Sequence, residues 1–179
     1  MRQAFAGWGE SVSEAQIKPA AVEHLPAIRE LAAVIWHAHY PGIIAREQID
    51  YMLARMYSLE TLRDELQTHG IRYERLLMND VLVGFAAYGP AADPESWKLH
   101  KLYLLPEQHG RGLGSQLLRH CETQTHSLGA RRLLLNVNKR NTKAIAAYQR
   151  NGYTVSDSVC LDIGDGFVMD DFVMAKSLS

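Results

Sequence analysis

The sequence contains little that would indicate a secreted, membrane-spanning or nucleic-acid-binding protein. Its 179 residues include 2 cysteines, and no apolar run approaches the roughly 20 residues needed to span a bilayer. Nineteen basic residues nearly balance 20 acidic ones, so the net charge of −1 gives no reason to expect a nucleic-acid or membrane partner. The N-terminal residues also lack the apolar segment of a signal peptide. Together these absences predict a cytoplasmic protein.

Metal sites and reactive cysteines are not indicated either. Eight histidines are present, but no group of His and Cys has the spacing of a metal site, so we expect no metal. Cys121 continues an apolar helical stripe, which favours burial over a disulfide or a nucleophilic role. Apolar residues make up 47% of the chain, enough for a folded core. We expect a single domain over residues 1–179, with residues 1–14 as a loose leader.

Apolar periodicity and turn residues predict alternating groups of helices and strands. Helices are expected over 23–41, 46–58 and 59–70, from Leu113 onward, and over 141–152. Strands are expected over 15–20, 72–78, 81–90, 97–105, 131–138, 153–162 and 169–177. The tight turns are expected at 79–80 and 165–166. This order predicts a mixed α/β sheet rather than a regular doubly wound fold.

Three glycines stand within five positions, at 110, 112 and 114, between a predicted strand and a predicted helix. Glycine allows a tight turn and lets a ligand approach the backbone amides. The start of a helix adds free N–H groups and a partial positive charge. Such a loop is typical of a phosphate-binding site.

Two common nucleotide-binding motifs do not fit this loop. A P-loop requires Lys-Ser or Lys-Thr after its last glycine, and neither pair follows here. A dinucleotide-binding fold requires G-x-G-x-x-G and an acidic residue about 20 positions later. Here the spacing is G-x-G-x-G, and no acidic residue lies between Glu122 and Asp157. A plain strand-to-helix turn remains an alternative, although one glycine would suffice for it.

Two segments resemble motifs of the GNAT superfamily of acyl-CoA N-acyltransferases. "HGRGLG" (109–114) resembles its [QR]-x-x-G-x-[GA] motif, with His109 where Gln or Arg is usual. "NVNKRNTKAIAAYQRNGY" resembles its N-x(2)-A-x(3)-Y-x(3)-G-[FY] block, through Asn141, Ala144, Tyr148, Gly152 and Tyr153. The resemblance covers about residues 81–176. It implies a central mixed, mostly antiparallel sheet with splayed strands, flanked by about four helices.

The resemblance also implies that acetyl-CoA is the cosubstrate. Backbone amides from Gly110 to Ser115 would hold its pyrophosphate, and the strand at 102–104 would pair with its pantetheine arm like an added strand. Asn141 would cap its helix, bind the arm, or do both. A basic segment near this block fits an anionic cosubstrate, and contains Arg131, Arg132, Lys139, Arg140, Lys143 and Arg150. The residues assigned to acetyl-CoA are Leu102, Tyr103, Leu104, His109, Gly110, Arg111, Gly112, Leu113, Gly114, Ser115, Asn136, Asn141, Lys143 and Tyr148.

Catalytic roles follow from the same resemblance, which implies direct attack of an amine on the thioester. Tyr148 occupies the family's position for the acid that protonates the leaving thiolate, and a purely structural core tyrosine is the alternative. The family's usual base positions hold Lys98 and Asn136, which are not acids. His100 is therefore the candidate base, since it alternates with Leu102 and titrates in a suitable range. A surface histidine is the alternative.

The acceptor is expected to be a small cationic amine such as a polyamine. Residues 151–175 contain no Lys or Arg but five acids, Asp157, Asp162, Asp165, Asp170 and Asp171. Such a surface near the acceptor would favour a cation, while a solvated hairpin is the plain alternative. The segments "EQIDYML" and "GFVMDDFVMAKSL" further resemble a bacterial branch that includes spermidine/spermine acetyltransferases. Weaker candidates for the acceptor pocket are His37, His39 and Tyr40.

Other functions stay open. The chain could acetylate protein N-termini or lysines, or bind acetyl-CoA as a sensor without turnover. Hydrolysis through Cys121 or a Ser/His pair is disfavoured, because no G-x-S-x-G elbow is present. A homodimer is compatible with the resemblance, since exposed terminal strands of this fold often pair between subunits.

Overall fold

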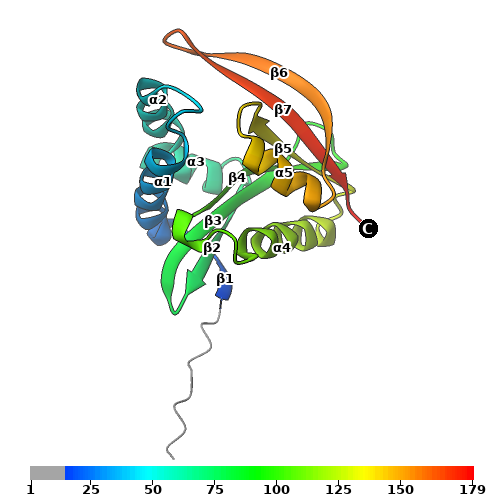
Figure 1. Ribbon diagram of the computed structural model, residues 1–179. Coiled ribbons are helices and arrows are strands. Elements are labelled where there is room, and N and C mark those ends of the chain that lie inside the picture. The colour runs from blue at the N-terminus through cyan, green and yellow to red at the C-terminus, as the bar shows by residue number, and fades with distance from the viewer. Residues whose placement is uncertain (1–14) are drawn as a thin grey trace, which may run out of the picture.

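The computed structural model describes residues 15–179, so the expected leader over 1–14 lies outside the described residues. Within that range seven strands form one sheet in the order β1-β2-β3-β4-β5-β7-β6 (Figure 1). The strands are β1 (Ala15–Pro19), β2 (Arg72–Met78), β3 (Val81–Pro90), β4 (Ser96–Leu104), β5 (Arg132–Asn138), β6 (Thr154–Gly164) and β7 (Phe167–Ser177). Only β4 and β5 are parallel; the other neighbouring pairs are antiparallel. The predicted mixed, mostly antiparallel sheet is confirmed.

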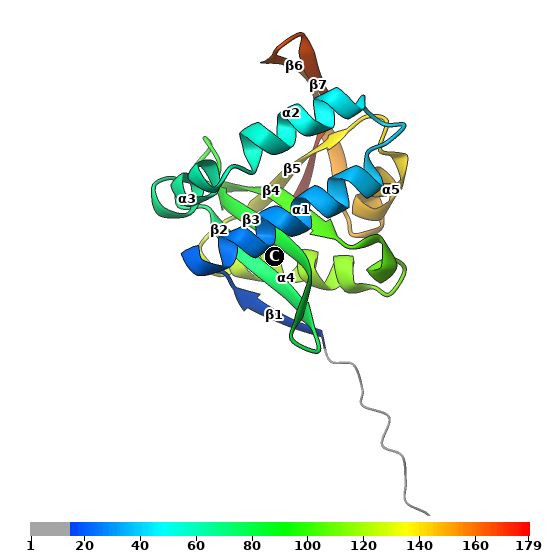
Figure 2. The same cartoon turned by 90° about the vertical axis from the view of Figure 1, so that its left-hand side faces the viewer.

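Five α-helices in the described chain, one more than the resemblance implied, cover both faces of the sheet (Figures 1 and 2). They are α1 (Leu25–His39), α2 (Arg46–Met56), α3 (Leu59–Gln67), α4 (Leu113–Ser127) and α5 (Thr142–Arg150). Two short 3-10 helices span Val22–His24 and Pro106–Gln108. Helices α1–α3 pack on one face, and α4 and α5 on the other. None of the helices between residues 15 and 179 is long and apolar enough to cross a membrane.

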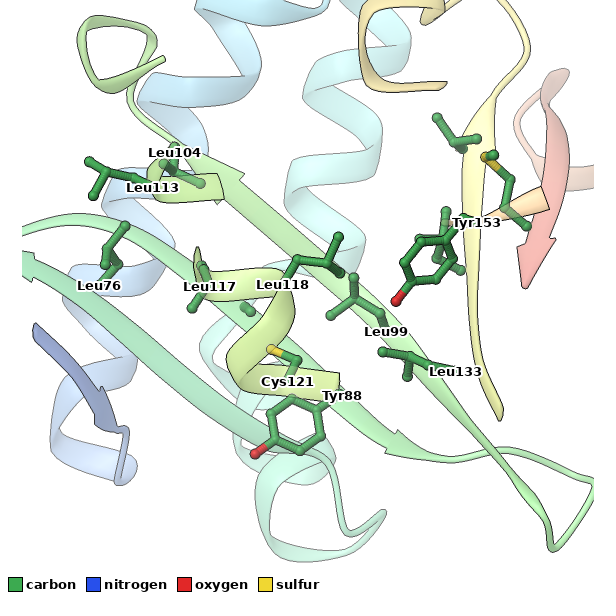
Figure 3. Packing of buried hydrophobic residues seen from close by; sticks show 14 of the residues in the cluster. Leu76, Tyr88, Leu99, Leu104, Leu113, Leu117, Leu118, Cys121, Leu133 and Tyr153 are labelled. Atoms are coloured by element: carbon green, nitrogen blue, oxygen red, sulfur yellow. The ribbon is translucent and has the colours of Figure 1, made fainter. Parts of the chain in front are cut away.

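Each face of the sheet has its own apolar core. On the α4 face, Leu117, Leu118 and Cys121 are buried against Leu133 and Tyr88 from the sheet (Figure 3). The burial of Cys121 confirms the prediction from its place in a helical stripe. On the opposite face, helix α1 buries residues that recur at helical spacing, namely Leu25, Ile28, Leu31, Ala32 and Ile35. These two cores hold the helices in place around the centre of the sheet.

The sheet splays apart between its two parallel strands. β4 pairs with β5 only over Ser96–Leu99, which face Arg132–Leu135. Beyond Leu99, β4 pairs with β3 alone, while Asn136–Asn138 of β5 pair with β7. The facing edges of β4 and β5 therefore separate and leave backbone groups free between them.

A β-bulge interrupts β4 at the point where the strands separate. Ala87 of β3 pairs with Lys101 and the next residue, Tyr88, pairs with Leu99, so His100 is an extra residue in β4. The bulge lets Leu99 and Leu102, three positions apart, pack into the same core on the α4 face. It therefore places His100 at the start of the splay.

Candidate active site

A cleft of about 1360 Å³ opens where β4 and β5 separate. One wall comes from the end of α1, from α2 and from β4; the other comes from β5, α5 and β7. The glycine loop and the start of α4 close one end. This volume is large for a single small ligand, so the cleft has room for both a cosubstrate and an acceptor.

The glycine loop leads directly into the start of α4. Gly110 and Gly112 have positive φ angles of 75° and 77°, a conformation that glycine adopts readily. Gly112 is the N-cap of α4, and Leu113, Gly114 and Ser115 follow it along the cleft wall. The first amides of a helix have no intrahelical acceptor, so this end offers N–H groups and positive potential to an anion. The glycine turn and the helix start that the sequence predicted are present, and the binding of a pyrophosphate by this loop stays a prediction.

Two side chains of this loop turn to neighbouring residues. Arg111 does not line the cleft, and its Nη1 donates to Gln108 Oε1 at 2.6 Å. His109 does line the cleft, and its Nε2 lies 3.2 Å from the carbonyl oxygen of Leu104. The loop presents mainly its backbone to a ligand.

The basic segment divides into two sets. Arg140, Lys143 and Arg150 line the cleft. The other three are engaged in ion pairs: Arg131 with Glu95, Arg132 with Asp93, and Lys139 with Asp170. Three of the six cations are thus placed to attract an anionic cosubstrate.

Asn141 caps α5 and also joins the two walls of the cleft. Its buried Oδ1 accepts a hydrogen bond from the amide of Ala144 at 3.2 Å. Its Nδ2 lies 3.1 Å from Nε2 of His39 at the end of α1. Burial and the neighbouring His109 lower the pKa of His39, so its ring is neutral at pH 7. The predicted cap is confirmed.

Tyr148 is half-buried on α5 and lines the cleft. Its ring lies 5.8 Å from that of Tyr153. Desolvation raises the pKa of Tyr148 above its ordinary value. The phenol is therefore protonated at physiological pH, the form that can donate a proton.

Aromatic side chains from α1 and β4 form the floor of the cleft. The hydroxyls of Tyr40 and Tyr103 are hydrogen-bonded at 3.3 Å, and the ring of Trp36 packs 4.6 Å from that of Tyr40. Burial raises the pKa values of both tyrosines. His37 lies outside this group, since it is exposed and 3.4 Å from Asp50. Of the three candidates at the end of α1, His39 and Tyr40 line the cleft.

His100 lines the cleft from its position in the β-bulge. Its side chain is exposed at the surface, as the alternative of a surface histidine implied. Partial desolvation at the cleft, with the nearby charges of Lys98 and Lys101, lowers the pKa of His100 to about 4. The ring is therefore neutral at pH 7, but it is a weaker base than an ordinary histidine.

Among the five acids of residues 151–175, only Asp171 lines the cleft. Its side chain is buried, with 4% of the residue exposed. Burial raises the pKa of Asp171, while a hydrogen bond with Asn136 and the charge of Lys98 oppose that shift. Lys98 itself does not line the cleft, and desolvation lowers its pKa. The other four aspartates are exposed on the hairpin.

Several residues of the cleft were not identified from the sequence. Lys101 is 3% exposed and makes a buried ion pair with Glu65 of α3, with Nζ–Oε distances of 2.6 and 2.7 Å. Three methionines, Met52, Met56 and Met169, line the cleft from its two opposite walls. In the sequence these methionines look like ordinary core positions, so no signal marks them as a pocket. In residues 15–179, no three His, Cys, Asp or Glu side chains gather in a way that could hold a metal ion.

Comparisons with known proteins place this geometry in context. Residues 26–153 match the acetyltransferase (GNAT) family. The spermidine N(1)-acetyltransferase of Thermoplasma acidophilum is 28% identical over 165 residues, which cover 90% of this chain and 96% of that protein.

Solved structures of acetyltransferases have a similar fold. PaiA N-acetyltransferase from Thermoplasma acidophilum, in complex with coenzyme A, superposes with a TM-score of 0.77 at 27% identity, covering 92% of this chain and 99% of its own. A GCN5-related N-acetyltransferase from Rhodopseudomonas palustris has a TM-score of 0.77 at 20% identity, covering 95% of this chain and 100% of its own. The latter likeness concerns the fold alone.

Proposed function

Because the chain belongs to the acetyltransferase (GNAT) family and is an acetyl-CoA-dependent N-acetyltransferase, we propose that its acceptor is the primary amine of a small cationic molecule such as a polyamine. The observation that carries this proposal is Asp171, a buried carboxylate on the cleft wall. A buried acid favours a cationic ligand that can neutralise it. The likeness to a spermidine N(1)-acetyltransferase, over nearly its whole length, supports the same choice.

The cleft fits acetyl-CoA through groups of this chain. The amides of the glycine loop would hold the pyrophosphate, with Arg140, Lys143 and Arg150 adding positive charge nearby. The free backbone of β4 beyond Leu99 would pair with the pantetheine arm. Bound acetyl-CoA supplies an activated acyl group as a thioester. The splay between β4 and β5 supports this placement because it leaves an unpaired strand edge inside the cleft.

In the proposed reaction, the neutral amine forms the new N–C bond and the C–S bond breaks. Tyr148 donates its hydroxyl proton to the leaving sulfur and regains a proton from solvent, and the proton lost from nitrogen leaves the site. We propose that His100 is the base that first accepts the proton from the amine nitrogen. Because the pKa of His100 is about 4, the ring cannot hold a proton at pH 7 and would pass it on to solvent.

Asp171 has a separate role in this proposal. Its carboxylate would bind a second ammonium group, or the acceptor amine before it loses its proton. Asn136 and Lys98 favour the charged form of Asp171 and so support that role. In relatives that acetylate protein N-termini, the position of Asn136 can hold a glutamate, and the amide here favours the small-amine acceptor.

Two proposals concern the setting of the protein. We place it in a reducing compartment such as the cytoplasm, supported by its two free cysteines, Cys121 and Cys160. We also propose a homodimer through the outer edge of β6. The exposed strand edge and the exposed side chains of Val155 and Leu161 support this pairing.

The test measures the release of CoA from acetyl-CoA by thiol titration. The acceptors offered are polyamines, amino acids, aminoglycosides and N-terminal peptides. We expect selective turnover of unbranched cationic amines. Turnover of peptides alone would indicate a protein acetyltransferase. If no acceptor caused CoA release while acetyl-CoA still bound, the protein would be a sensor and the proposal would be contradicted.

A further inference from the structure

The tip of the β6–β7 hairpin packs against α2, far away in the sequence (Figures 1 and 2). Tyr51 Oη donates to the carbonyl oxygen of Ile163 at 2.6 Å, and Arg55 Nη1 donates to the same oxygen at 2.7 Å. Arg55 also donates to Tyr51 Oη at 2.6 Å. The ring of Tyr51 packs 5.3 Å from that of Phe167. We call these interactions the tip contact.

The two elements joined by the tip contact also line the cleft from opposite sides, and we call the part between them the acceptor end. From α2, Met52 and Met56 line the cleft; from β7, Met169 and Asp171 do so. Gln48 of α2 lines the cleft and also binds the hairpin, because its Nε2 donates to the carbonyl oxygen of Val168 at 2.8 Å. The tip contact therefore holds the methionines of α2 at a set distance from Asp171.

These walls indicate the shape of the acceptor. Three methionines provide apolar surface, and Asp171 provides a buried carboxylate in the same cleft. An unbranched chain of methylenes can lie along the methionines while an ammonium group meets the carboxylate. A branched or bulky amine would need the walls to move apart.

We propose that Tyr51, Arg55 and Gly164 determine acceptor specificity by fixing the width of this end of the cleft, so that primary amines on unbranched aliphatic chains are selected. This inference rests on the proposed function and adds to it the shape of the substrate. Neither Tyr51 nor Arg55 lines the cleft. Both act through the position of the hairpin.

Gly164 makes this arrangement testable from the hairpin side. It has a φ of +93°, and a Cβ atom there would lie 2.7 Å from Tyr51 Oη and 3.3 Å from Arg55 Nη1. An alanine would therefore displace both donors from Ile163. Gly166, two residues away, has a φ of +77° and no atom within 4 Å of such a Cβ. Gly166→Ala introduces a similar backbone strain without touching α2, so it is the matched control.

The experiment measures KM and kcat for one unbranched and one branched primary amine with the wild-type protein, Gly164→Ala and Gly166→Ala. We expect Gly164→Ala to reduce the preference for the unbranched amine about tenfold, a typical effect of altered pocket fit. The KM for acetyl-CoA should stay within about twofold, and Gly166→Ala should behave like the wild type. Tyr51→Phe, which keeps the ring and removes the hydroxyl, should shift selectivity in the same direction if Gly164→Ala does not fold.

Unchanged selectivity in Gly164→Ala and Tyr51→Phe would overturn this inference alone. So would an equal rise in the KM for amine and for acetyl-CoA, because that indicates general damage. A wild-type protein that turns over no amine would overturn the proposed function, and this inference with it.

Discussion

At the scale of single residues, the environment of the cleft disfavours the charged form of each of four titratable groups that line it, one of which is an acid. Tyr148, His39 and His100 are all neutral at pH 7 because the cleft disfavours their charged forms. Asp171 is the acid in the same cleft, and the same physics raises its pKa. A site whose groups are mostly uncharged suits the transfer of an acetyl group from a neutral thioester to a neutral amine.

Replacing Tyr148 by Phe should lower kcat about 100-fold, because the leaving thiolate loses its proton donor. The KM for acetyl-CoA should change little, since the ring remains. Steady-state kinetics of CoA release measures both. Tyr153→Phe is the matched control: Tyr153 packs beside Tyr148 but does not line the cleft. Equal losses in both variants would contradict the role of Tyr148 as the acid.

Asp171→Asn should raise the KM for a cationic amine about 10- to 100-fold, the usual effect of losing a hydrogen bond to a charged group. The variant should also be more stable than the wild type at pH 7. The pKa of Asp171 is raised in the folded protein, so its contribution to stability is present at low pH and is lost as the pH rises through that pKa.

Denaturant unfolding at pH 7 and pH 3 measures this difference, which should vanish at pH 3. Asp170→Asn is the control, because Asp170 is exposed, pairs with Lys139 and does not line the cleft. An unchanged KM in Asp171→Asn would show that the carboxylate does not bind the amine.

At the scale of elements, most helices and strands could be predicted, because each has a local signal. The turn at Asn79 and Asp80 has φ angles of 50° and 62°, as its residue types indicate. Gly112 likewise precedes α4 as its motif predicts. The β-bulge at His100 could not be predicted, since apolar alternation in β4 carries no mark of an extra residue.

The start of α4 provides a direct test of the anion site. Gly112→Ala should weaken acetyl-CoA binding about tenfold and destabilise the fold by about 1 kcal/mol, because φ is positive there. Gly129→Ala beyond the other end of α4 has the same backbone problem, with a φ of +92°, but does not line the cleft. Calorimetric titration measures the Kd for acetyl-CoA in both variants, so the effect of backbone strain can be separated from the loss of binding. Equal affinity losses in the two variants would contradict the assignment.

At the scale of the whole molecule, the two walls of the cleft are joined by few interactions. The sheet contributes four residue pairs between β4 and β5, and side chains add Asn141 with His39 and Arg140 with the carbonyl oxygen of Gly42. The tip contact adds a further connection. None of the side-chain contacts could be read from the sequence, because their partners are 98, 102 and 112 residues apart and their meeting depends on how the sheet twists. The same reason explains why Asp171 could not be singled out from its four neighbours.

Acetyl-CoA should therefore stabilise the molecule by bridging both walls. At a concentration 100 times its Kd, the expected gain is about 2.7 kcal/mol, or a rise in Tm of about 5–10 °C for a protein of this size. Thermal unfolding with and without acetyl-CoA measures the shift. Gly112→Ala at the same concentration should show a smaller shift, and an unchanged Tm in the wild type would contradict binding in the cleft.

The bulge in β4 also bears on how this site can change during evolution. Lys101 and Leu99 already pair with the neighbouring residues Ala87 and Tyr88, so deleting His100 would restore regular alternation in β4. Lys101 would keep its place beside Glu65, and Leu99 its place in the core. Descendants of this chain are thus free to replace the histidine or to lose it, and with it the chemistry at the start of the splay, while the faces of the strand stay as they are.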